Sequence, residues 1–204
     1  MNVVFRCDAS IQIGTGHVMR CLTLADELAR QGAKCYFICR EHEGNLIDFI
    51  TKKGYETYTL EAVSLGSSEK NQAESALFHS EWLGTTQETD AKLVLDIISG
   101  IQPNWLVVDH YALDSYWEEN LRPHCDNILV IDDLADRKHD CDVLLDQNFL
   151  PNFKNRYNNL VSNATTQLLG PSYTLLKNEY SEIRNLNKQS EHLNTPQIPV
   201  SYTH

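Results

Sequence analysis

Short apolar runs alternate along the chain with longer stretches in which apolar residues recur every three or four positions. The short runs, rich in β-branched and aromatic residues, predict buried strands at residues 3–5, 35–39, 55–60, 105–108, 128–131, 143–145 and 167–169. The periodic stretches predict helices over residues 17–31, 46–54, 85–100 and 114–121. This alternation is typical of an α/β protein whose parallel sheet is covered by helices on both faces. We expect roughly six or seven strands, with the strand at residues 3–5 in a central position.

Particular residues mark where several of these helices begin and end. Gly32 follows the first helical stretch and Gly54 closes the second, at positions where a glycine readily takes the left-handed conformation that ends a helix. Thr85 and Glu88 have the spacing of a capping box at the start of the third helix, which we expect to end at Gly100.

Two parts of the chain lack a clear period. Residues 61–84 are dominated by Ser, Gly, Glu and Gln and predict an irregular excursion, and residues 186–204 read as a linker or tail. A last helix is expected from about Tyr173 to Asn185. The 204 residues therefore predict one domain over residues 1–185, followed by the tail.

Composition excludes several classes of partner. The formal net charge is −11 and no Lys/Arg-rich run occurs, so the chain lacks the basic footprint that nucleic acid or an anionic membrane requires. No apolar stretch approaches the ~20 residues of a membrane span, and the N-terminus does not resemble a signal peptide. We expect a cytoplasmic protein.

The six cysteines are scattered and form no C-x-x-C pair. We interpret them as small buried hydrophobes in a reducing compartment, and expect no metal site and no cofactor.

Polar residues follow abruptly after several predicted strands. They include Asp8 after the first strand, the run 109–111 (Asp-His-Tyr), the pair Asp132–Asp133, and the run 146–148 (Asp-Gln-Asn). Parallel strands end at the same edge of a sheet, and ligands bind beyond the carboxyl ends of such strands. We therefore expect a site at this edge.

The run Gly14-Thr15-Gly16-His17 lies between the first strand and the first helix. Glycines there allow positive φ and close approach of the backbone to a ligand, and free N–H groups at the helix start suit a phosphate or sugar oxygen. The positive end of the helix dipole disfavours imidazolium, so we expect His17 to be neutral and able to act as a general base. The alternative is that His17 only supports an ordinary strand–helix turn.

Two other candidates remain open from the residues alone. His110 could serve as a base or could hold a backbone carbonyl in its loop. Asp132 and Asp133 could bind a metal ion, but adjacent carboxylates are more often a solvated turn.

Five blocks together resemble a known enzyme family. They are FRCDASIQIGTGHVMRCLTLADELARQG, HSEWLG, VVDHYALD, VIDDLADRKHDCDVLLDQN and LLGPSYTLLKNEY, and they cover about residues 2–184 in order. Their sequence is similar to the UDP-2,4-diacetamido-2,4,6-trideoxy-β-L-altropyranose hydrolases of pseudaminic acid biosynthesis. The resemblance implies one Rossmann-like half of a two-domain GT-B fold, and release of UDP from a UDP-sugar by water with inversion at the anomeric carbon.

The resemblance also implies residue roles. The histidine of the G-x-G-H block activates the water, which assigns that role to His17, and the tyrosine of the D-H-Y block lies near the sugar, which assigns Tyr111. With the edge residues above, the expected substrate-binding set is Asp8, Gly14, Thr15, Gly16, Tyr111 and Asn148.

Family members continue into a second domain that holds most of the uridine diphosphate contacts. Residues 198–202 could begin that domain, and a separate chain could supply it. We expect the 204 residues alone to bind UDP weakly. Two other functions stay open, a sugar transferase of the same fold that uses a hydroxyl in place of water, and a non-enzymatic half-domain that binds a partner.

Overall fold

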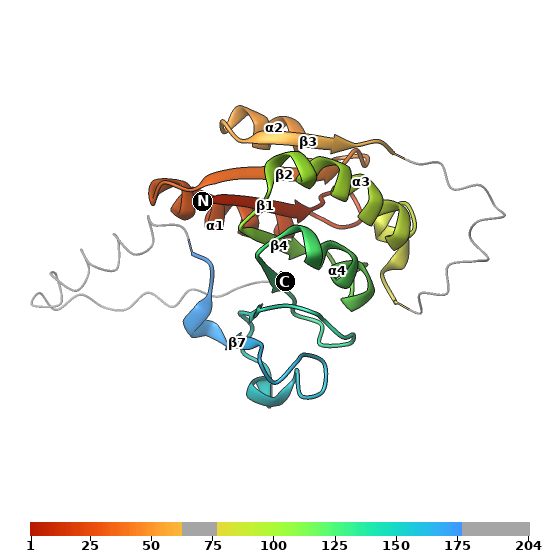
Figure 1. The fold of residues 1–204 in the computed structure, drawn as a ribbon. Coiled ribbons are helices and arrows are strands. Elements are labelled where there is room, and N and C mark those ends of the chain that lie inside the picture. Colours follow the sequence, from red (N-terminus) through yellow and green to blue (C-terminus); the bar gives the residue numbers. More distant parts are fainter. Residues whose placement is uncertain (63–76, 177–204) are drawn as a thin grey trace, which may run out of the picture.

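The computed structural model describes residues 1–62 and 77–176, in which strands and helices alternate as far as residue 131, and the last two strands are joined by loops and a short 3₁₀ turn (Figure 1). The strands are β1 (Asn2–Cys7), β2 (Lys34–Arg40), β3 (Glu56–Leu60), β4 (Trp105–Asp109), β5 (Asn127–Ile131), β6 (Val143–Asp146) and β7 (Thr166–Leu169). The α-helices are α1 (Gly16–Arg30), α2 (Ile47–Lys52), α3 (Gln87–Ile101) and α4 (Ser115–Leu121). Short 3₁₀ turns cover Ser80–Leu83, Arg122–His124, Phe153–Asn155 and Pro171–Tyr173. The predicted strands are confirmed.

The seven strands form one parallel sheet in the order β3-β2-β1-β4-β5-β6-β7. From β1 the chain first builds outward to β3, then returns to place β4 on the other side of β1. The strand order reverses between β1 and β4, so the two loops that leave these strands diverge and open a crevice at their carboxyl ends. The first strand is thus an interior strand beside this reversal point.

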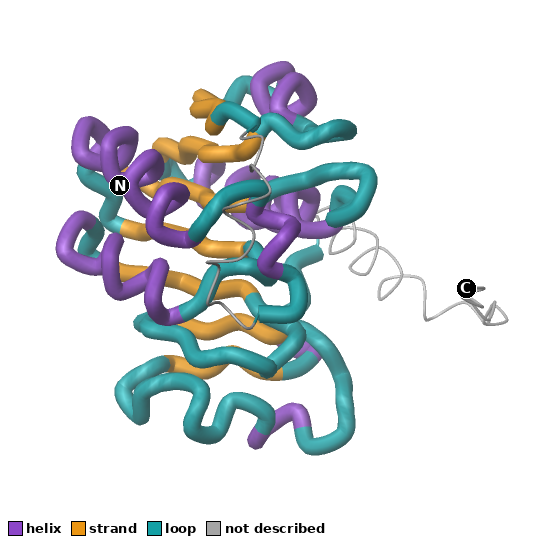
Figure 2. The backbone as a smooth tube through the Cα atoms, turned by 90° about the vertical axis from the view of Figure 1, so that its right-hand side faces the viewer, coloured by secondary structure: helices purple, strands orange, loops and turns teal. Residues whose placement is uncertain are grey.

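Successive residues of a strand face opposite sides of the sheet, and the two sides are covered by different helices. Figure 2 shows the strands stacked with helices on both sides. Val3 and Phe5 pack with α1 and α2, whereas Val4 packs with α3 and α4. Burial of both faces explains the nearly continuous apolar runs of the strands, because neither face can carry an exposed polar row.

Two helix ends differ from the sequence prediction. Thr86, not Thr85, caps α3, because the Thr86 backbone is extended and its Oγ1 accepts a hydrogen bond from the Thr89 amide, whereas Thr85 is buried. The helix does not end at Gly100 but continues to Ile101, which packs against the core, and Gln102 takes the left-handed conformation with φ 52°.

The helix expected from Tyr173 does not begin there. Residues Pro171–Tyr173 form a single 3₁₀ turn and Thr174 is extended, which breaks the helical path. The rest of that expected helix, the tail at residues 186–204 and most of the irregular excursion lie outside the described residues.

All six cysteines are free, and five of them are buried, as their interpretation as small hydrophobes predicts. In the described ranges, 1–62 and 77–176, no helix has both the length and the apolar character to cross a bilayer.

Candidate active site

The loop from β1 to α1 brings the glycine–histidine block to the carboxyl edge of the sheet. Gly14 has φ +77° and its amide donates to the Ser10 carbonyl at 2.8 Å, so this glycine does use the left-handed conformation. Gly16 does not, since it is the first residue of α1; the expectation of positive φ at Gly16 is wrong. Thr15 is the exposed residue before the helix and its side chain makes no capping bond.

His17 is held by a carboxylate from the neighbouring strand. Its Nδ1 lies 2.5 Å from Oδ1 of Asp109, the last residue of β4, which pairs in register with Cys7 of β1. Burial raises the pKa of Asp109, but His17 and Arg20 outweigh burial and hold that pKa below its ordinary value. Because Asp109 is ionised, Nδ1 carries the proton, and in the neutral ring Nε2 is then the atom that can accept one.

A second carboxylate and a tyrosine complete a continuous polar chain. Arg20 lies one helical turn after His17 and donates twice to Asp109, each at 2.6 Å, and once to Asp133 at 2.9 Å. The Tyr111 hydroxyl donates to the other oxygen of Asp133. Burial and this hydrogen bond raise the pKa of Tyr111, so the phenol is neutral at physiological pH.

A cavity of about 490 Å³ opens beside this chain of side chains. Its lining combines polar groups with apolar ones: Ile13, Gly16, His17, Met19, Arg20, Thr23, Tyr111, Asp133, Gln147, Leu175 and Leu176. The rings of His17 and Tyr111 meet edge to face, with centroids 4.5 Å apart. Their location on the same edge, expected from the sequence, is confirmed.

Asp8 and Asn148 do not line this cavity. Asp8 is fully buried beneath the edge, where it accepts from Arg6 and from the Arg40 amide, each at 2.6 Å, and lies 3.2 Å from Nε2 of His110. Asn148 lies beside the lining residue Gln147, and its amide donates to Asp146. Gly14 and Thr15 shape the loop without lining the cavity themselves, so of the expected binding set Gly16 and Tyr111 line the cavity.

His110 is a buried part of the scaffold. Its Nδ1 accepts from the Ala112 amide at 3.1 Å, which puts the ring proton of the neutral form on Nε2, toward Asp8. Burial lowers the pKa of His110, although Asp8 opposes this effect. The ring therefore supports its loop and does not face the cavity.

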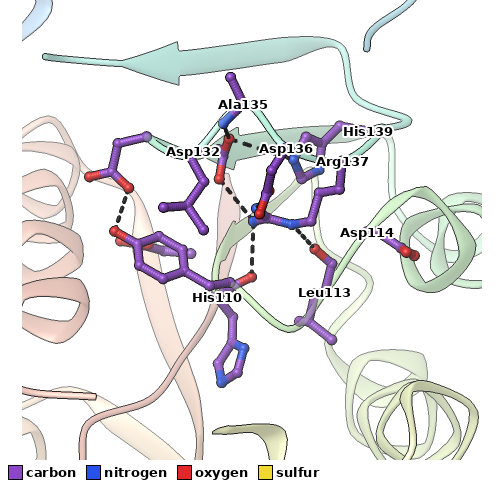
Figure 3. Close-up of polar contacts among 12 residues, drawn as sticks. His110, Leu113, Asp114, Asp132, Ala135, Asp136, Arg137 and His139 are labelled. Atoms are coloured by element: carbon purple, nitrogen blue, oxygen red, sulfur yellow. Dashed lines mark hydrogen bonds and ion pairs between the residues drawn. The ribbon is translucent and has the colours of Figure 1, made fainter. Parts of the chain in front are cut away.

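Asp132 also stabilises the loops, through the polar contacts drawn in Figure 3, and it is not among the residues that line the cavity. Its carboxylate pairs with Arg137 at 2.9 Å and accepts from the Ala135 amide. Arg137 in turn donates to the Leu113 carbonyl at 2.7 Å, which ties the loop after β5 to the loop that carries Tyr111. Within the described residues no group of three or more His, Cys, Asp or Glu side chains could hold a metal ion.

Aromatic side chains extend the wall formed by Tyr111. The Trp82 ring stacks with Tyr111 at 5.8 Å between centroids, and the His79 ring packs against both, 4.2 Å from Trp82 and 5.4 Å from Tyr111. Trp82 thus contacts the site through Tyr111, although it does not itself line the cavity.

Arg20 was not predicted as a site residue, and Asp109 and Asp133 were predicted only to lie at this edge of the sheet, without a role. A signal existed for each of them. Arg20 stands three residues after His17 and so shares its helical face, while Asp109 and Asp133 follow apolar strands. Their partners come from elements about 90 and 110 residues away, and only the sheet order brings these elements together.

Replacement by alanine is expected to have different effects at Gly14 and at Gly16. A Cβ at Gly16 would meet no protein atom within 4 Å, and Gly16 lines the cavity. Gly16→Ala should therefore keep its melting temperature, but it should lower kcat/KM of the reaction proposed below at least about tenfold by displacing the molecule bound in the cavity. Gly14→Ala should instead lose about 1–2 kcal/mol, because its φ of +77° strains any residue with a Cβ.

Gly32→Ala is the matched control, since Gly32 has φ +89° at the far end of α1. It should lose stability like Gly14→Ala and keep its kcat/KM. Thermal melting of the three variants, and steady-state assays of the same variants in the fusion protein described below, provide the comparison. Parental kcat/KM in Gly16→Ala would mean that substrate does not approach this backbone.

The fold and this edge define a class, namely a doubly wound α/β protein with a histidine–carboxylate pair beside a cavity at the point where the strand order reverses. No family model matches the chain. It is 28% identical, over 94% of its length, to the UDP-2,4-diacetamido-2,4,6-trideoxy-β-L-altropyranose hydrolase of Campylobacter jejuni, of which it covers 58%. The chain is therefore a weak homologue of a nucleotide-sugar hydrolase.

A second relative is an uncharacterized protein of Methanocaldococcus jannaschii, 21% identical over 99% of this chain and 36% of that protein. The chain thus spans between about a third and three fifths of the length of these two relatives.

Proposed function

We propose that this chain carries the general base of a nucleotide-sugar hydrolase, and that its substrate is UDP-2,4-diacetamido-2,4,6-trideoxy-β-L-altropyranose. The observation that carries the proposal is the pairing of His17 Nδ1 with the ionised Asp109 beside the cavity. The weak homology to the Campylobacter hydrolase supports the reaction class and supplies the candidate substrate.

In the proposed reaction, Nε2 of His17 removes a proton from a water molecule in the cavity. The water oxygen forms a bond to the anomeric carbon, the bond from that carbon to the phosphate oxygen breaks, and its electron pair leaves with UDP. Asp109 keeps Nδ1 protonated and stabilises the imidazolium that forms, as an orienting carboxylate does in hydrolytic triads. For an inverting displacement, the water and the leaving UDP lie on opposite faces of the sugar ring.

The charge of the cavity wall favours the sugar, not the diphosphate, as the group bound next to His17. Arg20 is the cation of the lining, and two carboxylates already compensate its charge. We therefore propose that residues 1–185 form the sugar-binding half and that a further domain, in cis or in a separate chain, supplies the main contacts with UDP. Calorimetry should then detect weak or no UDP binding to the 204-residue chain, and tight binding would contradict this division.

The test of the reaction is release of UDP with no acceptor present. The chain is assayed with the UDP-sugar alone and after fusion to the part of the Campylobacter hydrolase that it does not match. UDP and free sugar in equal amounts from the fusion, lost on His17→Asn, support the proposal. Release that requires an added sugar or lipid hydroxyl would indicate a transferase, and no release in either setting would overturn enzymatic function.

A further inference from the structure

We infer that Arg20 is the positioning residue of this site, because its guanidinium joins the carboxylate that holds His17 to the carboxylate that holds Tyr111. The inference deepens the proposed function and depends on His17 being its base. Arg20 itself is expected to act through Asp109 and Asp133 and not by removing a proton.

The contacts of Arg20 match the fixed geometry of a guanidinium. Nε and one terminal nitrogen donate to the two oxygens of Asp109, each at 2.6 Å, and the other terminal nitrogen donates to Asp133 at 2.9 Å. A lysine has a single charged nitrogen on a flexible stem and cannot hold two carboxylates in this fork. The Arg20 side chain is only 12% exposed, so water does not compete strongly for these bonds.

Both carboxylates depend on this cation for different reasons. The Asp109 side chain is fully buried, and Arg20 is one of the two groups that keep it ionised against the cost of burial. The Asp133 carboxylate accepts from Tyr111 with one oxygen and from Arg20 with the other, so Arg20 also fixes the direction in which Tyr111 points. One residue thus sets the geometry of the base and of the tyrosine ring that contacts it.

Arg20 also balances the charges around His17. The groups near the ring are Asp109 from β4, His110 and Tyr111 from the loop after β4, Arg20 from α1, and Asp133 beyond Arg20. Of these, Arg20 is the fixed cation, and its charge offsets that of the Asp109 carboxylate that contacts the ring.

The experiment follows the His17 ring by ¹⁵N NMR in the full chain, without substrate. Arg20→Met should raise the pH midpoint of the ring by about 1–3 units, the size of effect expected when one nearby charge is removed. Arg20→Lys keeps the charge, so its midpoint should stay near the parental value. Its Nδ1 proton signal should nevertheless be lost to solvent exchange, because Asp109 is no longer fixed. Arg30→Met, an exposed arginine on the same helix, is the control and should leave the ring unchanged.

Kinetics on the active fusion give the second readout. Arg20→Lys should lower kcat roughly 10–100-fold. This is the range found in metalloenzymes when a residue that orients a metal-binding side chain is replaced. A folded Arg20→Met chain with an unchanged midpoint would overturn the inference. If Arg20→Met does not fold, an Arg20→Lys chain with the parental Nδ1 signal would overturn it. The NMR result needs no turnover, so absence of UDP release would contradict the proposed function while the ring titration still decides the role of Arg20.

Discussion

Replacing His17 by asparagine in the active fusion is expected to lower kcat by about 10²–10⁴, the contribution typical of a general base. Water is a poor nucleophile, and no proton acceptor would then stand at the position of Nε2. The asparagine amide can still donate to Asp109, so the buried carboxylate keeps a partner and KM should change little. The parental rate should fall on the acid side, because an imidazolium cannot accept the proton of water.

His17→Leu separates catalysis from stability. It removes both the base and the hydrogen bond to Asp109, which Arg20 continues to pair. A histidine that only supports the helix start would give variants with lower melting temperatures and near-normal kcat in the folded fraction. Measuring kcat and melting temperature on both variants distinguishes these cases, and a folded His17→Leu enzyme with normal turnover would remove this residue from the mechanism.

Replacing Asp90 by asparagine should cost about 3–5 kcal/mol of stability, since it leaves buried positive charge uncompensated. Asp90 lies in α3 and accepts from Arg6 at 2.8 and 3.1 Å, from Arg40 at 2.7 Å and from the Trp117 indole at 3.0 Å. Its three partners are all fully buried. With Asp8, the cluster holds two arginines and two aspartates, so the substitution leaves one excess positive charge inside the protein.

Urea unfolding measures this loss as a lower midpoint with an unchanged slope. Asp96→Asn is the matched control, because Asp96 is an exposed residue of the same helix and its replacement should change the midpoint little. Equal midpoints for the two variants would mean that the Asp90 cluster does not stabilise the fold.

The same cluster predicts a dependence of stability on pH. Burial raises the pKa of Asp90, but Arg6 and Arg40 outweigh it and hold the pKa below its ordinary value. A carboxyl whose folded pKa is lowered contributes its full stability above its unfolded pKa of about 3.9. This contribution is lost as pH falls from there through the folded value, so the difference between the parent and Asp90→Asn should shrink below about pH 4.

The order of strands and helices could be predicted from the sequence because each element depends on a local pattern. Runs such as Val3–Phe5 and Ile128–Ile131 are buried on both faces of a parallel sheet and therefore lack polar positions. Gly32 and Gly54 do follow helices in the left-handed conformation. The helix ends at Thr85 and Gly100 were placed wrongly because burial of Thr85 and packing of Ile101 depend on neighbours distant in sequence.

The candidate site likewise combines features that local sequence patterns predict with features that only the pairing of distant strands determines. The chain places His17 at the start of a helix and Tyr111 after a strand, and both locations were predicted from local spacing. The partner of His17 could not be predicted, because it depends on β4 lying next to β1 and on the register that pairs Asp109 with Cys7. The helix dipole alone therefore does not describe the electrostatic surroundings of His17, because the ionised Asp109 carboxylate lies 2.5 Å away.

Burial likewise decided which polar residues face the cavity. Asp8 and Asp132 follow strands just as Asp109 and Asp133 do, so the sequence by itself does not distinguish site residues from scaffold residues among these four aspartates. In the folded chain, Asp8 and Asp132 compensate buried arginines, and Asp133 lines the cavity with Arg20. The sequence determined that carboxylates gather at one edge of the sheet. Only the tertiary structure decided which of them stabilise the scaffold and which form the site, because the location of each counter-charge is set by contacts between distant segments.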